Sequence, residues 1–472
     1  MNELQTYQAL LAATQRGAVA KTTRRHVHLS PRSLVVVGYH LAGDPGALLA
    51  LMWGTSRDQK PHIIAVPEPR NRALRFEALS TFATEFVAYL SQFEPRGEGG
   101  VCLDAPQLVV PNTATAEWLG GVVGRFTRNL HTDGDGAAPP SVPLAGKHLS
   151  FFANPLPGSS LVLKMTEALT VHWQTGQLPL ENLNLAALLG WIDPPAGADG
   201  PRAARIGEAQ PPAGPVSDPN WDAGTLAALI RDWHNAGDDA GRANVRRRLD
   251  HEVRDQLTRA WCDCWRGLQI LNTLSAGDHV SERWRSDRKN WTEHCNRITK
   301  NHAHFRNIPT PIQAADRLRL IEYRTEKLQH EMACDDRLIM AALVASGEAL
   351  IGQVVAADLD RRTLKPDGKR SRQPLITIEP AIEFARPAGT TLYLSAHPNV
   401  KLEVLPQSAN GQIRVQVLRG ANQTSTVARL PAVGDEVVLS PYEKPTLYPR
   451  LKVVEIPWTH QQVRDGELEE EE

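Results

Sequence analysis

The spacing of apolar residues changes three times along the chain. In the first part of the chain it predicts strands mixed with helices. Three apolar runs are separated by turns rich in proline, glycine and charged residues, which predicts three antiparallel strands. A helix with one apolar face is expected from about Leu74 to Phe93, and a fourth strand and another helix follow it. The predicted order is therefore β-β-β-α-β-α. The four strands are expected at Ser33–Leu41, Ala47–Thr55, His62–Pro69 and Ala105–Asn112.

The next stretch predicts two helices and then a linker. The first helix is expected from Ser159 to Gly176, with Ser159 or Ser160 as its N-cap, and the second from Leu180 to Ile192. Residues 194–220 are crowded with proline, glycine and alanine and contain almost no large apolar residue. Because such a composition cannot form a core, we expect a linker there.

Residues 221–358 are predicted to be helical, because apolar residues recur at spacings of three and four in three successive runs. The first run resembles the apolar seam of a coiled coil. Short breaks separate the runs, so this region predicts an antiparallel helical bundle or stalk. The seam residues of the first run are Leu249, Val253, Leu257, Trp261, Cys264, Leu268 and Leu271.

The C-terminal part alternates between apolar and polar residues with a period of two. This alternation predicts a small β-barrel or sandwich from residue 375 to about residue 460. The acidic residues at the end of the chain predict a disordered tail. The protein is therefore expected to be a multidomain α+β chain. Its predicted parts are an α/β domain (1–193), a linker (194–220), a helical stalk (221–358), a basic linker (359–374), a β-barrel (375–460) and an acidic tail (461–472).

The β-β-β-α-β-α order resembles the RNase H-like fold, including the DEDD-type exonucleases, over roughly Ser33 to Trp191. In that family the first strand carries an Asp-x-Glu pair that holds two divalent cations for phosphodiester hydrolysis. The nearest carboxylate here is Asp44, in the following turn, and Asn112 lies where a later strand would supply a metal ligand. The resemblance therefore implies an RNase H-like α/β domain without its acidic motif. The residues on the first strand are Val37, Gly38, Tyr39 and His40.

Composition narrows the class of protein. The chain has 472 residues and a net charge of −1, which leaves room for several domains. No apolar run approaches the roughly 20 residues that cross a bilayer, and no signal peptide is apparent, so no membrane partner is expected. Five scattered cysteines favour free thiols in a reducing compartment, and we expect a cytoplasmic location. Frequent alanine, arginine, proline and glycine are typical of a high-GC bacterial genome.

Motifs for nucleotide and cofactor chemistry are absent from the sequence. There is no G-x-x-x-x-G-K-[ST] loop and no G-x-S-x-G elbow, so neither an ATPase activity nor a cofactor is predicted. Cys262 and Cys264 lie two apart on a predicted helix and point away from each other, which disfavours a shared metal ion. His26 and His28 would share one face of a strand and are the remaining metal candidates. Because no carboxylate partner is evident from the spacing, no metal site is predicted.

Basic residues concentrate on the second predicted helix of the stalk and in the loop after residue 360. A row of arginines and lysines on one side of a helix can follow a phosphate backbone, so DNA or RNA is an expected partner. The alternative is a solvated helix face, since long helices usually carry mixed charge. The candidate nucleic-acid-binding residues are Arg283, Arg285, Arg288, Lys289, Arg297, Lys300, Arg306, Lys369 and Arg370.

A nuclease-like fold without its acids, a helical stalk and a barrel together resemble the accessory parts of a nucleic-acid motor, such as a superfamily 1 helicase. We therefore expect a non-catalytic nucleic-acid-binding or scaffolding subunit of a bacterial helicase, ATPase or antiviral defence complex. One alternative is a metal-dependent nuclease or phosphoesterase with dispersed ligands, and another is a pure protein-interaction scaffold. The catalytic candidates of the nuclease alternative are His40, Asp44, Asp104 and Asp193.

Overall fold

The computed structural model describes residues 3–134, 136–153, 155–300, 310–364, 370–406, 411–420 and 430–443. The chain forms two compact units. The N-terminal unit comprises residues 1–155, 159–303 and 332–346, and the C-terminal unit comprises residues 156–158, 304–331 and 347–472. None of the helices in the described ranges is long and apolar enough to cross a membrane.

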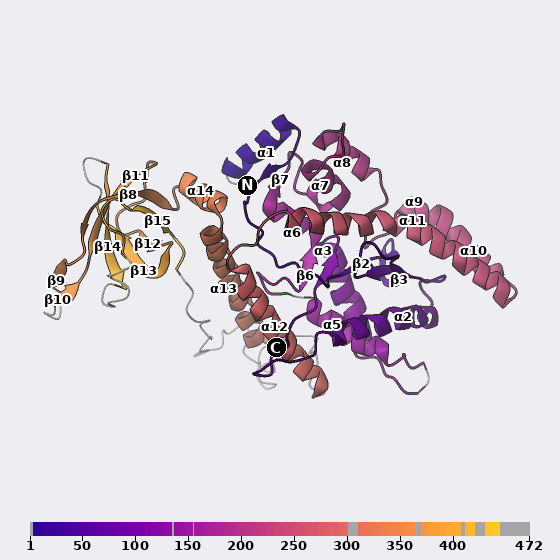
Figure 1. Cartoon of the computed structure of the whole chain (residues 1–472). Helices are drawn as coiled ribbons and strands as arrows, with labels where there is room; N and C mark the ends of the chain where they lie inside the picture. Colours follow the sequence, from indigo (N-terminus) through magenta and orange to yellow (C-terminus); the bar gives the residue numbers. More distant parts are fainter. Residues whose placement is uncertain are drawn as a thin grey trace, which may run out of the picture. The chain divides into compact units, whose positions relative to one another are not determined.

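A five-stranded sheet with the order β4-β3-β2-β5-β6 lies at the centre of the N-terminal unit (Figure 1). β2, β3 and β4 form an antiparallel meander, whereas β5 and β6 run parallel to β2. Four of these five strands, β2 to β5, overlap the apolar runs from which the sequence predicted strands. The strands are β2 (Leu34–Leu41), β3 (Asp44–Gly54), β4 (His62–Ala65), β5 (Leu108–Val110) and β6 (Val162–Lys164).

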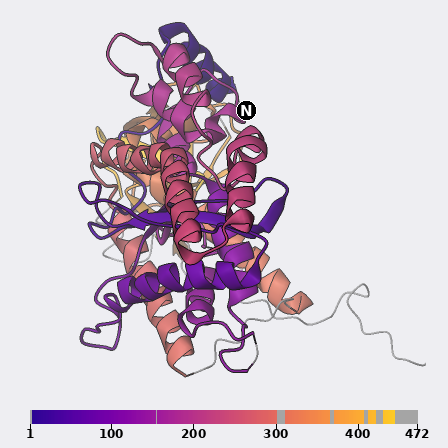
Figure 2. The ribbon, with the colours of Figure 1, turned by 90° about the vertical axis from the view of Figure 1, so that its right-hand side faces the viewer.

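Helices cover both faces of this sheet, and Figure 2 shows α2 on one side and α10 and α11 on the other. Alternate residues of β2 enter two separate cores: Val36 faces α2, α5 and α12, and Val37 faces α7 and α11. Burial on both faces explains why β2 reads as a continuous apolar run. The helices named here are α2 (Arg72–Ser91), α5 (Ser141–Phe152), α7 (Leu185–Ile192), α10 (Ala227–Asn235), α11 (Asp239–Asn272) and α12 (Val280–Thr299).

The other elements of the N-terminal unit are short. The antiparallel pair β1–β7 joins the end of the first helix to the chain after α6. A π-helical stretch, η1, continues the helix that follows β5. These elements are α1 (Glu3–Gln15), β1 (Val19–Ala20), α3 (Thr113–Glu117), η1 (Trp118–Gly124), α4 (Arg125–Thr127), α6 (Met165–His172), β7 (Trp173–Gln174), η2 (Glu181–Leu183), α8 (Gly200–Glu208), α9 (Pro219–Trp221), η3 (Asp222–Leu226) and α14 (Arg337–Ala345).

The fifth strand, β6, lies where the sequence predicts the start of a helix. The helix α6 begins at Met165 rather than at Ser159 or Ser160, because the preceding residues pair with β5. The amide of Leu108 donates to the carbonyl of Leu161 at 2.9 Å, which starts this ladder. The helix prediction was therefore correct only for its middle part, because α6 ends at His172 and the next two residues form β7.

Part of the predicted linker at 194–220 is packed structure. The helix α8 lies against α7, and its N-cap Asp199 accepts a hydrogen bond from the amide of Arg202. The two helices approach so closely that a Cβ on Gly190 would lie 2.7 Å from the backbone carbon of Ala203. Small residues thus build this contact where large apolar residues are missing from the sequence.

The central region is helical, but its helices α11 and α12 pack on opposite faces of the sheet and do not form a stalk. The seam of α11, including Leu249, Val253 and Leu257, packs on the sheet and on α7. On the opposite side of the sheet, Trp284, Trp291 and Cys295 of α12 enter the other core. The regular spacing was read correctly as an apolar helix face, but that face contacts a sheet instead of a partner helix.

The C-terminal unit contains a closed six-stranded antiparallel barrel, so the predicted barrel is confirmed. Its first strand begins at Leu350, inside the range predicted as stalk, and its core alternates along that strand through Leu350 and Val354. The predicted basic linker forms a hairpin, β9 (Arg362–Leu364) and β10 (Arg370–Arg372). The acidic tail lies outside the described residues. The remaining elements are α13 (Pro311–Asp335), β8 (Leu350–Asp358), β11 (Leu375–Pro380), β12 (Thr391–Leu394), β13 (His397–Val404), β14 (Ile413–Arg419) and β15 (Glu436–Ser440).

Candidate functional site

The C-terminal half of β2 is covered by residues 212–217, called here the covering segment. β5 pairs with β2 only at Leu34 and Val35, which leaves the following edge of β2 open. The covering segment occupies that edge through a parallel bridge between His40 and Val216. The amide of His40 donates to the carbonyl of Pro215 at 2.8 Å, so the segment extends the sheet where β5 has ended.

Two side chains hold the covering segment against the strand ends. The Tyr39 hydroxyl donates to the carbonyl of Pro212 at 2.5 Å, and burial raises the pKa of Tyr39 to well above its usual value. The Nδ2 of Asn112 donates to the carbonyl of Gly214 at 2.9 Å, while its Oδ1 accepts from the amide and hydroxyl of Thr115. Asn112 therefore caps α3 and anchors the covering segment. At the end of this segment a carboxylate takes part, because the Ser217 hydroxyl donates to Oδ2 of Asp222 at 2.7 Å.

Gly214 is required where the covering segment crosses β2. Its φ is +96°, and a Cβ there would lie 2.6 Å from the carbonyl oxygen of Gly38. We expect Gly214→Ala to lower the free energy of unfolding by clearly more than the ~1–2 kcal/mol of a positive φ alone. Gly99→Ala is the matched control, because Gly99 has φ +83° and open space around it. Urea denaturation of both variants would contradict this contact if their losses were equal.

The four catalytic candidates are held by different partners and do not meet in one site. The His40 ring is buried, and its Nδ1 lies 2.8 Å from the carbonyl oxygen of Leu41. Asp44 pairs with Arg70 at 3.2 Å on the surface.

The other two candidates lie in ion pairs of their own. Asp104 pairs with Arg32 at 3.0 Å and accepts a hydrogen bond from the indole of Trp284 at 3.0 Å. Asp193 pairs with Arg266 at 2.8 Å. Their contacts connect loops to helices α11 and α12, which is a structural use of each carboxylate.

His26 and His28 do not share one face, because the segment that carries them is not a strand. His26 lies 3.6 Å from Asp336 and stacks near His172. His28 stacks on Trp284 with ring centroids 4.0 Å apart, and burial lowers its pKa to about 4. Within the described ranges, no three His, Cys, Asp or Glu side chains gather as a metal site.

Two of the candidate arginines on α12 bind the protein's own backbone. Arg283 is buried and donates to the carbonyl of His26 at 3.0 Å. Arg288 donates from Nε to the carbonyl of Cys102 at 3.0 Å. Both guanidinium groups therefore hold loops against α12. Among the remaining candidates, Arg306 and Lys369 lie outside the described residues, and Arg370 lies in β10.

Three further candidates on α12 and Lys300, its C-cap, form one exposed row, called here the basic stripe. Arg285, Lys289, Arg297 and Lys300 are all exposed. Steps of four, eight and three residues place them on one side of the helix, with Glu293 between the second and third. The stripe lies opposite the buried Trp291 and Cys295, so packing of α12 on the core presents it to solvent.

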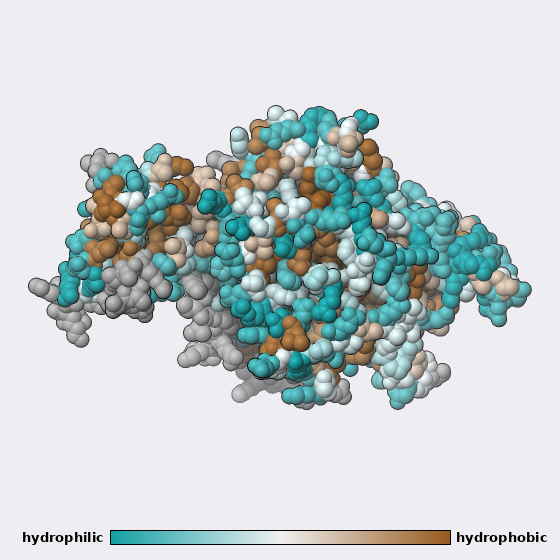
Figure 3. Space-filling model, viewed as in Figure 1, coloured by the Kyte–Doolittle hydropathy of each residue, from teal (hydrophilic) through white to brown (hydrophobic). Residues whose placement is uncertain are grey.

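Hydrophilic surface is not confined to the basic stripe. Figure 3 shows hydrophilic residues covering the projecting ends of α10 and α11. There Arg248 pairs with Asp232 at 2.7 Å and Arg246 pairs with Glu77 at 3.0 Å. The arginine cluster at the start of α11 is thus partly neutralised, whereas in the basic stripe only Arg297 has a carboxylate within 4.0 Å among the described residues, Glu293 at 3.8 Å.

Two features of the N-terminal unit were missed in the sequence. One is a buried pair on α5 and α12, in which Nδ1 of His148 lies 3.0 Å from Nε2 of His294. The other is a cavity beside α2, described below. Both join residues far apart in the chain, and no short motif marks them. Comparison of the chain with protein-family models, with curated proteins and with solved structures finds no match, so a functional proposal for this protein rests on its own geometry.

Proposed function

We propose that this protein is a non-catalytic nucleic-acid-binding subunit whose N-terminal unit is an RNase H-like domain. The chain order β2, β3, β4, α2, β5, α3 supports this fold, because it is the order of the family that the sequence resembles. β2, the strand that carries the acidic pair in that family, is the central strand of the sheet.

The contacts at the C-terminal ends of β2 and β5 support a non-catalytic role. A nuclease centre of this family would need carboxylates on β2 and two cations beside it. Here β2 carries Gly38 and Tyr39, and the covering segment lies against them. Asn112 uses its amide to cap a helix and to bind the same segment. A nuclease centre there would need both new acids and displacement of the covering segment.

The basic stripe is the observation that carries the binding proposal. Arg297 lies 3.8 Å from Glu293, whereas Arg285, Lys289 and Lys300 have no carboxylate within 4.0 Å among the described residues. At about 1.5 Å per residue the stripe is roughly 22 Å long. That length matches about six phosphates of one DNA strand at about 3.4 Å each.

Reversal of the stripe charges tests the proposal. We expect the quadruple variant Arg285→Glu, Lys289→Glu, Arg297→Glu and Lys300→Glu to lose most of its affinity for labelled single-stranded or duplex DNA or RNA. The wild type should show a slope of log affinity against log salt of about −3, because roughly four phosphate contacts release counterions. Fluorescence anisotropy at several salt concentrations measures both quantities.

A variant of equal net charge controls for this experiment. Arg202, Arg205, Arg231 and Arg247 are exposed on α8, α10 and α11, and their replacement by Glu changes the net charge equally. Equal loss of binding in both variants, or no binding by the wild type, would overturn the stripe as the interface. Cleavage of the probe in Mg²⁺ or Mn²⁺ would overturn the non-catalytic assignment.

We place the protein beside a bacterial helicase or ATPase, as in an antiviral defence complex. The sequence has no phosphate-binding loop of its own, so hydrolysis would have to come from another chain. In this arrangement the N-terminal unit binds the phosphate backbone of the nucleic acid. The protein then connects the nucleic acid to the motor.

A further inference from the structure

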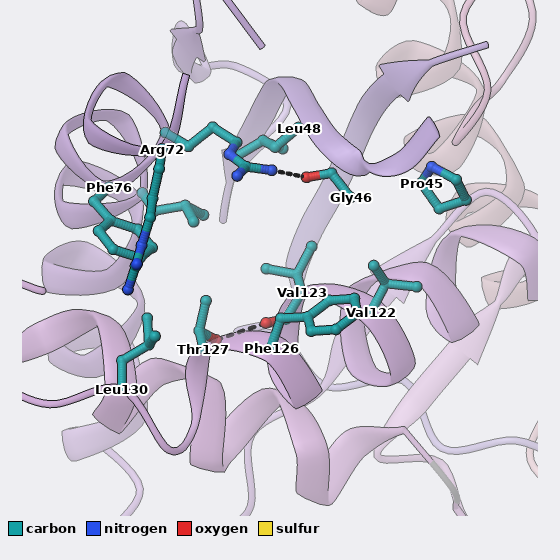
Figure 4. Close-up of a pocket in the computed structure, with 12 residues that line it drawn as sticks. Pro45, Gly46, Leu48, Arg72, Phe76, Val122, Val123, Phe126, Thr127 and Leu130 are labelled. Carbon is teal, nitrogen blue, oxygen red and sulfur yellow. Dashed lines mark hydrogen bonds between the residues drawn. The ribbon is translucent and has the colours of Figure 1, made fainter. Parts of the chain in front are cut away.

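A cavity of about 330 Å³ opens into the N-terminal unit between the start of β3, the first turns of α2 and the η1–α4 segment (Figure 4). Leu48, Leu79 and Val123 are buried where these three elements meet the core, and they line the cavity. The volume is at the lower end of the range of small-molecule sites, which is about 300–1,000 Å³. The cavity lies apart from the basic stripe and from the covering segment, whose residues do not line it.

The rim of the cavity carries two phenylalanines. Phe76 on α2 is half-buried, whereas 68% of Phe126 on α4 is exposed. Figure 4 shows the two rings on opposite sides of the opening. An exposed aromatic ring beside an apolar hollow is the arrangement that an apolar ligand covers favourably.

Among the residues that the structure describes, Arg72 supplies a cation at this opening. The guanidinium of Arg72 lies 5.1 Å from the centroid of the Phe76 ring, and Arg72 is exposed. The neighbouring Arg75 instead donates to the carbonyl of Gly46, so it closes the wall between α2 and β3. The cavity lining includes Arg72 and Arg75 but no acidic residue.

The nearby carboxylates do not compete for Arg72. Asp44, at the start of β3, pairs with Arg70 at 3.2 Å. Glu77, on the exposed side of α2, pairs with Arg246 at 3.0 Å. The charge of Arg72 at the mouth is therefore open to an incoming anion.

The wall opposite α2 is fixed in place by close helix packing. Val122 and Val123 belong to the π-helical stretch η1, a geometry that often marks functional sites. A Cβ on Gly124 would lie 2.9 Å from the amide nitrogen of Ser150, so η1 packs directly on α5. The cavity is thus part of the folded unit and does not need a rearrangement to form.

We propose that this cavity binds a small amphipathic carboxylate. The apolar chain or ring of the ligand would fill the hollow over Val123, and its carboxylate would pair with Arg72 in a forked, charge-assisted geometry. At about 30 Å³ per water, the cavity has the volume of about ten water molecules. A ligand that fills it would have about the same volume. A single available guanidinium matches one negative charge, which favours a carboxylate over a doubly charged phosphate.

Octanoate and 1-octanol are the probes that test this proposal. We expect octanoate to bind the full-length protein at one saturable site in isothermal titration calorimetry. Arg72→Gln should weaken octanoate by at least about tenfold and leave the weaker binding of 1-octanol unchanged, because only octanoate has a charge to pair. Arg231→Gln is the control, because Arg231 is an exposed arginine on α10 that does not line the cavity.

A second pair of variants tests the cavity itself. Val123→Trp should fill the hollow and abolish binding of both probes, and Phe126→Ser should weaken both, with little risk to folding because Phe126 is exposed. No saturable octanoate binding by the wild type would overturn the proposal. Equal weakening of octanoate and 1-octanol by Arg72→Gln, or unchanged binding in Phe126→Ser, would also overturn it.

Discussion

At pH 5 the N-terminal unit is expected to unfold at a much lower urea concentration than at pH 7. Four imidazoles are the cause, three of them buried and that of His28 half-buried, because removal from water lowers their pKa values below the unfolded value of about 6.5. The lowered pKa values are about 4 for His28, His148 and His172 and about 3 for His294.

The sign follows from proton binding. Between pH 6.5 and pH 4 the unfolded chain binds protons that the folded unit excludes, so stability is complete above pH 6.5 and is lost as the pH falls. Each of the three buried imidazoles contributes a loss of about 2 kcal/mol at pH 5, and the half-buried His28 contributes less because solvent screens it. Asp250 and Asp263 act in the opposite sense, because burial raises the pKa of each, and they reduce the net loss. The remaining sum is still comparable with the ~5–15 kcal/mol of a typical domain.

The pair between α5 and α12 separates this effect from general acid unfolding. His148 and His294 lie 3.0 Å apart, and the positive charges of Lys147 and Arg297 add to the burial that keeps them neutral. We expect the double variant His148→Gln and His294→Gln to lose about 4 kcal/mol less than the wild type between pH 7 and pH 5. An unchanged difference between the two urea midpoints would contradict the assignment to this pair.

Local periodicity predicted the elements that are long enough to repeat. The apolar run of β2 continues over eight residues. The spacing of three and four in α2 repeats over several helical turns. β6 has only three residues, which is too short to show a period before α6 begins. Its strand state comes from pairing with β5, a contact across about fifty residues of sequence.

The covering segment shows why composition alone misled the prediction at residues 194–220. Proline, glycine and alanine suggested a linker, but here they allow two backbones to approach closely. Gly214 fits against the carbonyl of Gly38 because it has no side chain, and Gly190 accepts the backbone of α8 for the same reason. Which small residues face which neighbours is decided by the tertiary fold.

The sequence showed which residues of α12 are basic. Composition could not show which of them bind the protein's own backbone and which face solvent. Arg283 and Arg288 flank the buried face and bind backbone carbonyls, whereas Arg285 and Lys289 point to solvent. The helical position relative to Trp291 carries this information. The backbone partners of Arg283 and Arg288, in contrast, come from loops more than 180 residues away.

Replacement of Trp291 by alanine is expected to cause a large loss of stability, about 5 kcal/mol. Trp291 is fully buried, stacks against Phe152 and packs against His148. Truncation of a buried aromatic side chain costs about 3–5 kcal/mol, and the lost indole bond leaves the carbonyl of Phe93 without its donor. Trp291→Phe should cost about half as much, because it keeps most of the apolar contact. Urea denaturation at pH 7 measures both losses.

The same measurement separates the two faces of α12. Trp291 anchors the helix to the core, while Arg285, Lys289, Arg297 and Lys300 face solvent on the opposite side. The charge-reversal variant of the basic stripe should therefore keep the urea midpoint of the wild type within about 0.5 kcal/mol while it loses nucleic-acid affinity. A Trp291→Ala loss below about 2 kcal/mol would mean that α12 is not fixed by this residue, and the stripe would then lack the rigid support that its geometry requires.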